Sequence, residues 1–182
     1  MREFQPGYTL VEMMVSIVII SILLMIGVPS YSSVTTSNRI SYEVNELMGD
    51  IELGRSEALK RGLTVIVCPS TDGINCSTGT NWAQGWVVFT STGDCTSSTG
   101  QVVRIKQALA GNDTAVFTAN VAGNDSLCFT RSGLLSSDYN GMFFFNAASP
   151  SSSYLRCVTV SAMGRAQSYR NGQLDASGNL CQ

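Results

Sequence analysis

A single carboxylate, Glu12, lies near the start of an apolar run that extends from Tyr8 to Val28. An ionised side chain at the centre of a membrane helix costs about 3 kcal/mol on insertion scales. Pairing with a cation removes much of that cost, and intramembrane carboxylates are rare unless they have a role. The position of Glu12 therefore indicates that this carboxylate has a role.

The chain contains six cysteines, which are Cys68, Cys76, Cys95, Cys128, Cys157 and Cys181. An even number in a polar, Ser/Thr/Gly-rich region without a C-x-x-C pair favours disulfides in an oxidising compartment over a zinc site. Six cysteines allow fifteen connectivities. Local pairing favours Cys68 with Cys76 and Cys157 with Cys181, which would leave Cys95 for Cys128; the first pair is the best supported.

Histidine is absent, which removes the commonest general base and the commonest metal ligand. The carboxylates, lysines and hydroxyls form no catalytic motif, so we expect no enzyme, no cofactor and no metal. The formal net charge is −2, so no global basic field indicates nucleic acid. Residues 95–182 are nevertheless mildly basic, with six Lys/Arg against four Asp/Glu.

A long helix is the first element that the sequence predicts. Residues 8–28 would measure about 31 Å as a helix, close to the roughly 30 Å hydrocarbon core of a bilayer. Residues 29–62 predict an amphipathic continuation, kinked at Pro29 and ended by Gly62. Its apolar stripe comprises Ile40, Val44, Leu47, Ile51 and Ala58. Charged residues take its other faces: Arg39, Glu43, Glu46, Asp50 and Glu57.

A cleaved secretory signal peptide is the alternative to a retained helix, with cleavage near residues 27–33. Three observations argue against it. The leader is barely basic, because Glu3 balances Arg2; Glu12 interrupts the apolar run; and the helical pattern continues beyond Pro29.

The remaining residues, 63–182, predict a β-rich globular domain. Short apolar runs separated by Gly, Ser, Asn and Asp clusters indicate strands at 63–68, 85–90, 101–108, 114–121, 126–131, 142–146 and 154–161. Because no long helix follows the first one, parallel crossovers are not expected. The sequence therefore predicts an α+β fold in which an antiparallel sheet or small sandwich packs on the apolar stripe of the helix.

The N-terminal residues Gly7-Tyr8-Thr9-Leu10-Val11-Glu12, with the apolar run and Pro29, resemble the class III signal of type IV pilins and type II secretion pseudopilins. The resemblance implies that a prepilin peptidase removes residues 1–7 by cutting after Gly7. It also implies methylation of the new terminal amine on Tyr8, where the family usually has Phe. In that family the carboxylate at the position of Glu12 meets the terminal amine of a neighbouring subunit.

Further blocks resemble the GspH/FimT branch of minor pilins and pseudopilins, and with them a pilin-like fold. They are residues 55–61 (RSEALKR), 68–70 (CPS) and 82–86 (WAQGW). Trp86 heads an apolar strand and is expected in the core, with Gly85 relieving crowding beside it. For Trp82, packing is the favoured interpretation and ligand stacking is the alternative.

Some FimT-like pilins bind DNA through a basic C-terminal Gly-Arg-x-Arg motif. This chain has Gly164 and Arg165, but Gln167 stands in place of the second arginine. Arg156 and Arg170 lie nearby in the sequence and complete the candidate DNA-binding set. Two or three arginines on a hairpin are more often a solvated face, so we treat DNA as a partner that is not favoured.

The resemblance implies a minor pilin that is a structural or initiating subunit of a type IV pilus, near its tip. The alternatives are a DNA-binding minor pilin for natural transformation and a GspH-like minor pseudopilin of a type II secretion system. The implied partners are other pilins or pseudopilins, the prepilin peptidase, an inner-membrane assembly platform and membrane lipid. The implied location is the bacterial inner membrane, with a cytoplasmic N-terminus and a periplasmic globular domain, and later the extracellular pilus.

Overall fold

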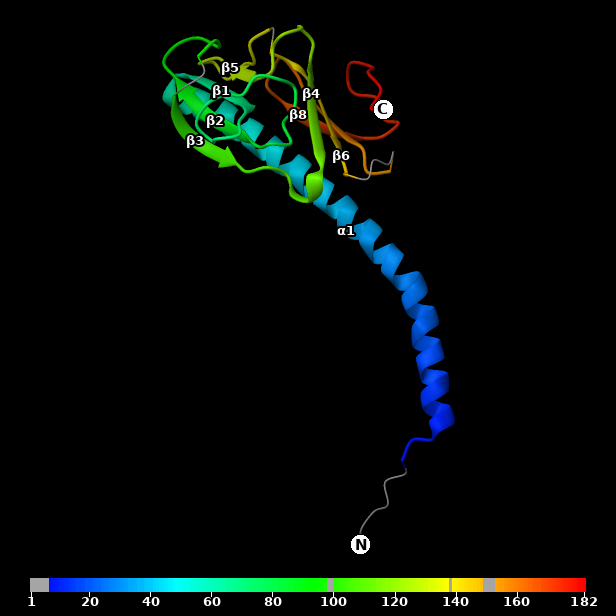
Figure 1. Cartoon of the computed structure of the whole chain (residues 1–182). Coiled ribbons are helices and arrows are strands. Elements are labelled where there is room, and N and C mark those ends of the chain that lie inside the picture. The colour runs from blue at the N-terminus through cyan, green and yellow to red at the C-terminus, as the bar shows by residue number, and fades with distance from the viewer. Residues whose placement is uncertain (1–6, 98–99, 138, 149–152) are drawn as a thin grey trace. The chain divides into compact units, whose positions relative to one another are not determined.

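The computed structural model describes residues 7–97, 100–137, 139–148 and 153–182, without the side chains of residues 28 and 29. Within these residues, one long helix precedes eight strands and a 3-10 turn (Figure 1). The elements are α1 (Leu10–Arg61), β1 (Thr64–Pro69), β2 (Trp86–Ser91), β3 (Gln101–Lys106), η1 (Ala110–Asn112), β4 (Thr114–Ala119), β5 (Leu127–Phe129), β6 (Gly141–Asn146), β7 (Arg156–Val160) and β8 (Ala166–Arg170). Residues 1–38 and 39–182 form two compact units, each described separately below.

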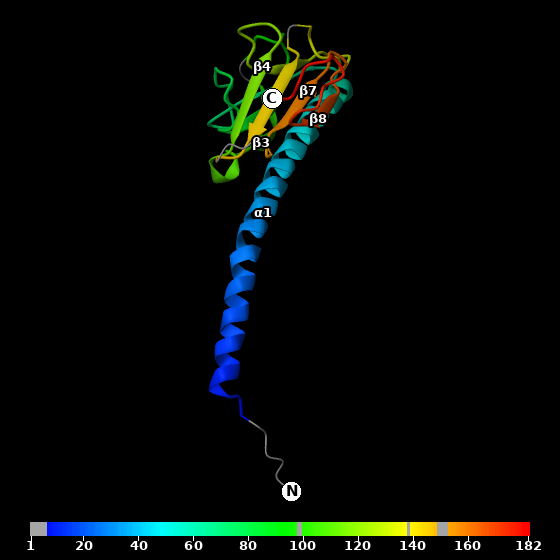
Figure 2. The ribbon, with the colours of Figure 1, turned by 90° about the vertical axis from the view of Figure 1, so that its right-hand side faces the viewer.

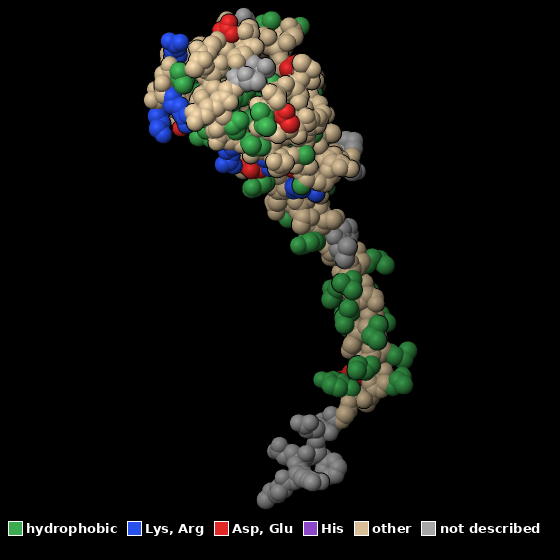
Figure 3. All heavy atoms as spheres, turned by 60° about the vertical axis from the view of Figure 1, so that its left-hand side comes forward, with side chains coloured by type: hydrophobic (Ala, Val, Ile, Leu, Met, Phe, Trp, Pro, Cys, Tyr) green, Lys and Arg blue, Asp and Glu red, His purple; other side chains and the backbone are tan. Residues whose placement is uncertain are grey.

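The first unit contains the apolar part of α1. Its large hydrophobic side chains from Leu10 to Ile26 are all more than half exposed, and Figure 3 shows them gathered around this part of the helix. The helix is long and apolar enough to cross a membrane. Of the leader 1–7, only Gly7 lies within the described residues. The backbone is helical at Pro29, whose side chain lies outside the described part, so the kink expected there stays a prediction.

In its described part, the second unit holds two four-stranded sheets in which every pairing is antiparallel. The first has the strand order β3-β2-β1-β5, and the second has the order β4-β6-β7-β8 (Figure 2). The predicted antiparallel architecture is confirmed, with two sheets and one additional strand. That strand is β8, which the sequence did not reveal because Ala-Gln-Ser-Tyr-Arg has no alternating apolar pattern.

The main core lies between α1 and the inner faces of both sheets. The helix contributes the predicted apolar stripe, Ile40, Val44, Leu47, Ile51 and Ala58. Gly54 faces β1 and β5, where a Cβ atom would lie 3.2 Å from the Val67 side chain. Aromatic rings fill the opposite side, and the Trp82 and Phe143 rings meet edge to face with centroids 4.7 Å apart. Trp82 and Trp86 are both fully buried, so the packing interpretation of this pair is confirmed.

The outer faces of the sheets carry two smaller cores, and disulfides line both of them. Ile66 and Phe89 pack with the bonded pairs Cys68–Cys76 and Cys95–Cys128 on the first sheet. On the second sheet, Phe144 packs beside Cys157–Cys181. The Cα atoms of the three pairs lie 5.5, 5.6 and 5.8 Å apart. Cys68–Cys76 and Cys157–Cys181 are the pairs that local spacing favours, and Cys95–Cys128 is the pair that they leave. Together they fasten loops and the C-terminal segment over apolar surface.

Two glycines have backbone roles in positioning these elements. Gly62 ends α1 with φ +64°, and its N–H donates to the Ala58 carbonyl at 3.0 Å. Gly85 has φ +104°, and a Cβ atom there would lie 2.3 Å from the Lys106 carbonyl oxygen. Gly85 therefore lets β2 begin against β3 where any side chain would collide.

Candidate functional site

The segment around Glu12 begins the helix with a capping contact. Thr9 precedes α1, and its Oγ1 accepts a hydrogen bond from the Glu12 N–H at 3.3 Å. Thr9 is therefore the N-cap, and Glu12 lies at the third helical position, where among the described residues it donates its N–H to the cap without the reciprocal side-chain bond of a full capping box. The partial positive charge of a helix N-terminus favours a carboxylate in this first turn. Sequence reasoning missed the cap, although Thr-x-x-Glu is its usual signature.

The other polar side chains deep in the apolar run are satisfied within the helix. Ser16 Oγ donates to the Glu12 carbonyl and Ser21 Oγ to the Ile17 carbonyl, each at 2.8 Å. Such bonds to the preceding turn remove the cost of a hydroxyl in hydrocarbon. The Glu12 carboxylate oxygens, by contrast, accept no hydrogen bond from any described residue. Glu12 is thus the one charged side chain of residues 8–28, and it has no partner among the described residues.

The three candidate arginines of the C-terminal region do not form one cluster. Arg156 on β7 lies directly opposite Arg170 on β8 in the strand register. Arg165 lies in the β7–β8 turn, directly before the first residue of β8 and so at the end opposite Arg170. Burial and the neighbouring Arg170 lower the pKa of Arg156. The structure thus brings together two of the predicted residues and leaves the Gly164-Arg165 motif apart from them.

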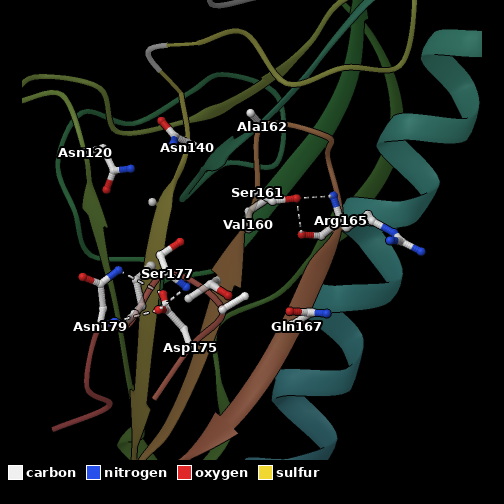
Figure 4. A pocket seen from close by; sticks show the side chains of 14 residues that line it. Asn120, Asn140, Val160, Ser161, Ala162, Arg165, Gln167, Asp175, Ser177 and Asn179 are labelled. Carbon is white, nitrogen blue, oxygen red and sulfur yellow. Dashed lines mark hydrogen bonds between the residues drawn. The ribbon is translucent and has the colours of Figure 1, made fainter. Parts of the chain in front are cut away.

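A polar pocket lies beside Arg165, but the guanidinium group does not point into it (Figure 4). Asn120, Asn140, Ser177 and Asn179 are among the residues that line it (Figure 4). Figure 4 shows the Arg165 guanidinium pointing away from Ser177 and Asn179. The pocket has a volume of about 190 Å³, below the roughly 300–1,000 Å³ of typical small-molecule sites.

Buried carboxylates occur on α1, where the sequence analysis placed charged faces. Glu43 and Asp50 are only 2% and 3% exposed. Burial raises the pKa of both groups. Arg104 on β3 donates to Asp50 at 2.8 Å, and Lys106 contacts Glu46. Asp50 and Glu46 therefore join α1 to β3 and have structural partners.

A second ionic contact holds α1 near η1. The Arg39 guanidinium donates to both oxygens of Asp113, at 2.6 and 2.7 Å, and Asp113 is buried. The Ala110 N–H donates to Glu43 Oε1 at 3.1 Å. A bidentate pair of this kind fixes geometry as well as charge. The polar face of the helix therefore packs against other elements instead of facing solvent. The helical period of the sequence alone could not show this.

Comparison with known proteins places these features in one family. A family model described as type II transport protein GspH matches residues 43–164, and the prokaryotic N-terminal methylation motif matches residues 4–28. Two crystal structures of the type IV minor pilin FimU from Pseudomonas aeruginosa PAO1 share the fold. They are 20% and 19% identical to this chain, with TM-scores of 0.56 and 0.54. Each alignment covers 71% of this chain, and 87% and 91% of the two FimU chains. The GspH match spans more than half of the sequence, and this chain therefore belongs to the GspH family.

Proposed function

We propose that this chain is a minor pilin, a noncatalytic subunit of a type IV pilus that is anchored in the inner membrane before assembly. One observation carries the proposal. The exposed apolar helix holds a carboxylate, Glu12, that no described residue pairs with, one turn after the methylation-motif residues Gly7 and Tyr8. Such a helix suits a subunit that leaves the lipid bilayer and packs against the helices of neighbouring subunits. Its carboxylate would gain a cationic partner during that transfer.

In this proposal the prepilin peptidase cuts after Gly7 and the Tyr8 amine is methylated. Glu12 then meets the terminal amine of a neighbouring subunit, while the assembly platform extracts the helix from the membrane. The N-terminus is cytoplasmic and residues 63–182 are periplasmic before export. The three disulfides and polar loops suit a domain displayed outside the cell at the tip of the filament.

The intact mass of membrane-extracted protein tests the processing step. We expect the loss of residues 1–7 and the gain of one methyl group on Tyr8. A mature chain that begins near Ser30 would instead establish a cleaved signal peptide and overturn the proposal.

A minor pseudopilin of a type II secretion system is the second candidate, because the matching family model is described by that transport function. Both candidates predict the same processed N-terminus. Deletion of this chain separates them: a minor pilin is needed for surface pili, whereas a pseudopilin is needed for secretion of folded proteins. Normal piliation together with lost secretion would select the pseudopilin.

A further inference from the structure

Figure 2 shows the edge strand β8 beside α1. A groove lies between them, within the unit of residues 39–182. Val44 and Asn45 line it from the helix, and Ser168 and Arg170 line it from the strand. Its volume is about 230 Å³, again below the roughly 300–1,000 Å³ typical of small-molecule pockets. A groove of this size suits inserted side chains of a partner better than a separate ligand.

The backbone of β8 is open to a further strand. Ser161 N–H donates to the Arg165 carbonyl at 3.0 Å, and Asn171 N–H donates to the Leu155 carbonyl at 3.3 Å. In an antiparallel pair, this pattern turns the backbone groups of odd-numbered residues toward β7. The even-numbered residues of β8 therefore direct their backbone groups outward.

Only one end of this outward edge is closed by the chain itself, within the described residues. Gln173 accepts a hydrogen bond from the Arg170 N–H at 2.8 Å through its side-chain oxygen, and its own N–H donates to the Arg170 carbonyl at 3.0 Å. Ala166 and Ser168 belong to the rest of the edge. Their outward donors and acceptors form the template for β-augmentation.

The charge beside this edge is positive. Arg156 faces Arg170 across the strands, and its Nη1 donates to the carbonyls of Ser153 and Leu155 at 3.2 and 3.0 Å. No described carboxylate lies within 4 Å of the Arg170 guanidinium. Like charges directly opposite each other on a sheet are unfavourable, and an anion between them removes that cost.

We propose that the outward edge of β8 binds an extended, acidic segment of a neighbouring filament subunit, and this proposal rests on the pilin function proposed above. The segment adds as a strand along Ala166 and Ser168. Because side chains alternate along a strand, an Asp or Glu on the face that looks toward α1 enters the groove beside Arg170 and Arg156. The backbone supplies affinity, and the two arginines select for a carboxylate.

Site-specific photocrosslinking in assembled filaments tests the location. A benzophenone residue replaces Ser168 in the full chain, and a matched variant carries it at Ser177, which is also exposed but lies outside the groove. We expect a crosslink from position 168 to an extended segment of another pilin that contains Asp or Glu, and about tenfold less of that product from position 177. Equal yields from both positions would overturn the proposal.

Charge reversal tests the chemistry. Arg170→Glu should lower incorporation into filaments about tenfold while the thermal unfolding of the isolated full chain stays unchanged. Arg170→Lys should retain part of the incorporation, and Arg131→Glu, an exposed arginine outside the groove, should retain all of it. Replacing the crosslinked Asp or Glu of the partner with Lys should restore the incorporation of Arg170→Glu into filaments.

Two results would contradict docking in different ways. If the wild-type chain enters filaments and Arg170→Glu enters equally well, docking at β8 fails and the pilin function stands; if the wild-type chain never enters filaments, both proposals fail. Salt-sensitive binding of a 30-base-pair DNA duplex that Arg170→Glu abolishes, with incorporation intact, would reassign the surface to nucleic acid.

Discussion

The indole Nε1–H of Trp86 donates a hydrogen bond of 2.8 Å to the Asp50 carboxylate, deep between β2 and α1. Trp86 belongs to the strand that Gly85 starts, and Asp50 belongs to the helix that carries the span. Both side chains are buried, and Arg104 donates to the other carboxylate oxygen. This contact couples the orientation of the helix in the second unit to the register of the first sheet.

Trp86→Phe should test that coupling. The change keeps most of the ring packing but leaves Asp50 Oδ2 without its donor, which costs about 1–3 kcal/mol of unfolding free energy for a buried acceptor. Urea denaturation of the full chain measures the loss. Trp82→Phe is the matched control, because the Trp82 Nε1 has no hydrogen-bond partner among the described residues. Equal losses in the two variants would show that ring volume matters and the hydrogen bond does not.

Glu43→Gln should stabilise the protein at neutral pH. Burial and the nearby Asp113 raise the pKa of Glu43, against smaller opposing effects of the Ala110 hydrogen bond, Lys106 and Arg39. Its second oxygen, Oε2, is buried and has no hydrogen-bond partner among the described residues. Glutamine keeps an acceptor for Ala110 and removes the charge. We expect a gain on the order of 1 kcal/mol at pH 7, as for other poorly compensated buried charges.

The sign of the pH dependence follows from that raised pKa. The contribution of Glu43 to stability is fully present below its pKa in the unfolded chain and is lost as the pH rises through the higher pKa of the folded protein. Urea denaturation across this window should show wild type losing stability relative to Glu43→Gln as the pH rises. Glu52→Gln is the control, because Glu52 is exposed. If the unfolding free energies of wild type and Glu43→Gln changed in parallel with pH, the pH dependence could not be assigned to Glu43.

The order of the disulfide contributions is also predictable. The bonded cysteines are 8, 33 and 24 residues apart in Cys68–Cys76, Cys95–Cys128 and Cys157–Cys181. In the chain-entropy model, replacing the 33-residue pair with serines should cost about 1 kcal/mol more than replacing the 8-residue pair. Calorimetry of the three double variants measures the loss of unfolding free energy for each pair. A larger loss for Cys68–Cys76 would show that covering the outer face of β1 outweighs loop entropy.

Local features of the fold could be read from the sequence because their causes are local. The apolar run, the glycine that ends α1 and the short cysteine loop each depend on neighbouring residues. The strand β8 could not be found in this way, because its pairing partner β7 and not its own pattern makes it a strand. For the same reason, the sequence could not predict the outward edge of β8 that we propose as a docking site.

Contacts between residues far apart in the sequence explain the other features that the sequence did not predict. The spacing of Glu43, Glu46 and Asp50 places them on one side of a helix, and a polar helix side is ordinarily solvated. Here Arg104 and Lys106, more than 50 positions later in the chain, meet that side and bury it. Likewise, the hairpin register alone places Arg156 against Arg170 and separates both from Arg165.

Glu12→Gln should separate membrane insertion from filament assembly. Glutamine has nearly the same shape but no charge, so insertion and cleavage after Gly7 should be unaffected. Incorporation should fall, because the terminal amine of the neighbouring subunit would stay unpaired among apolar helices. Ser16→Ala is the control, since the Ser16 hydroxyl is already satisfied by the Glu12 carbonyl. Immunoblots of membranes and sheared filaments measure both pools. Filament levels of Glu12→Gln equal to those of Ser16→Ala would mean that Glu12 serves only to complete the helix start that Thr9 caps.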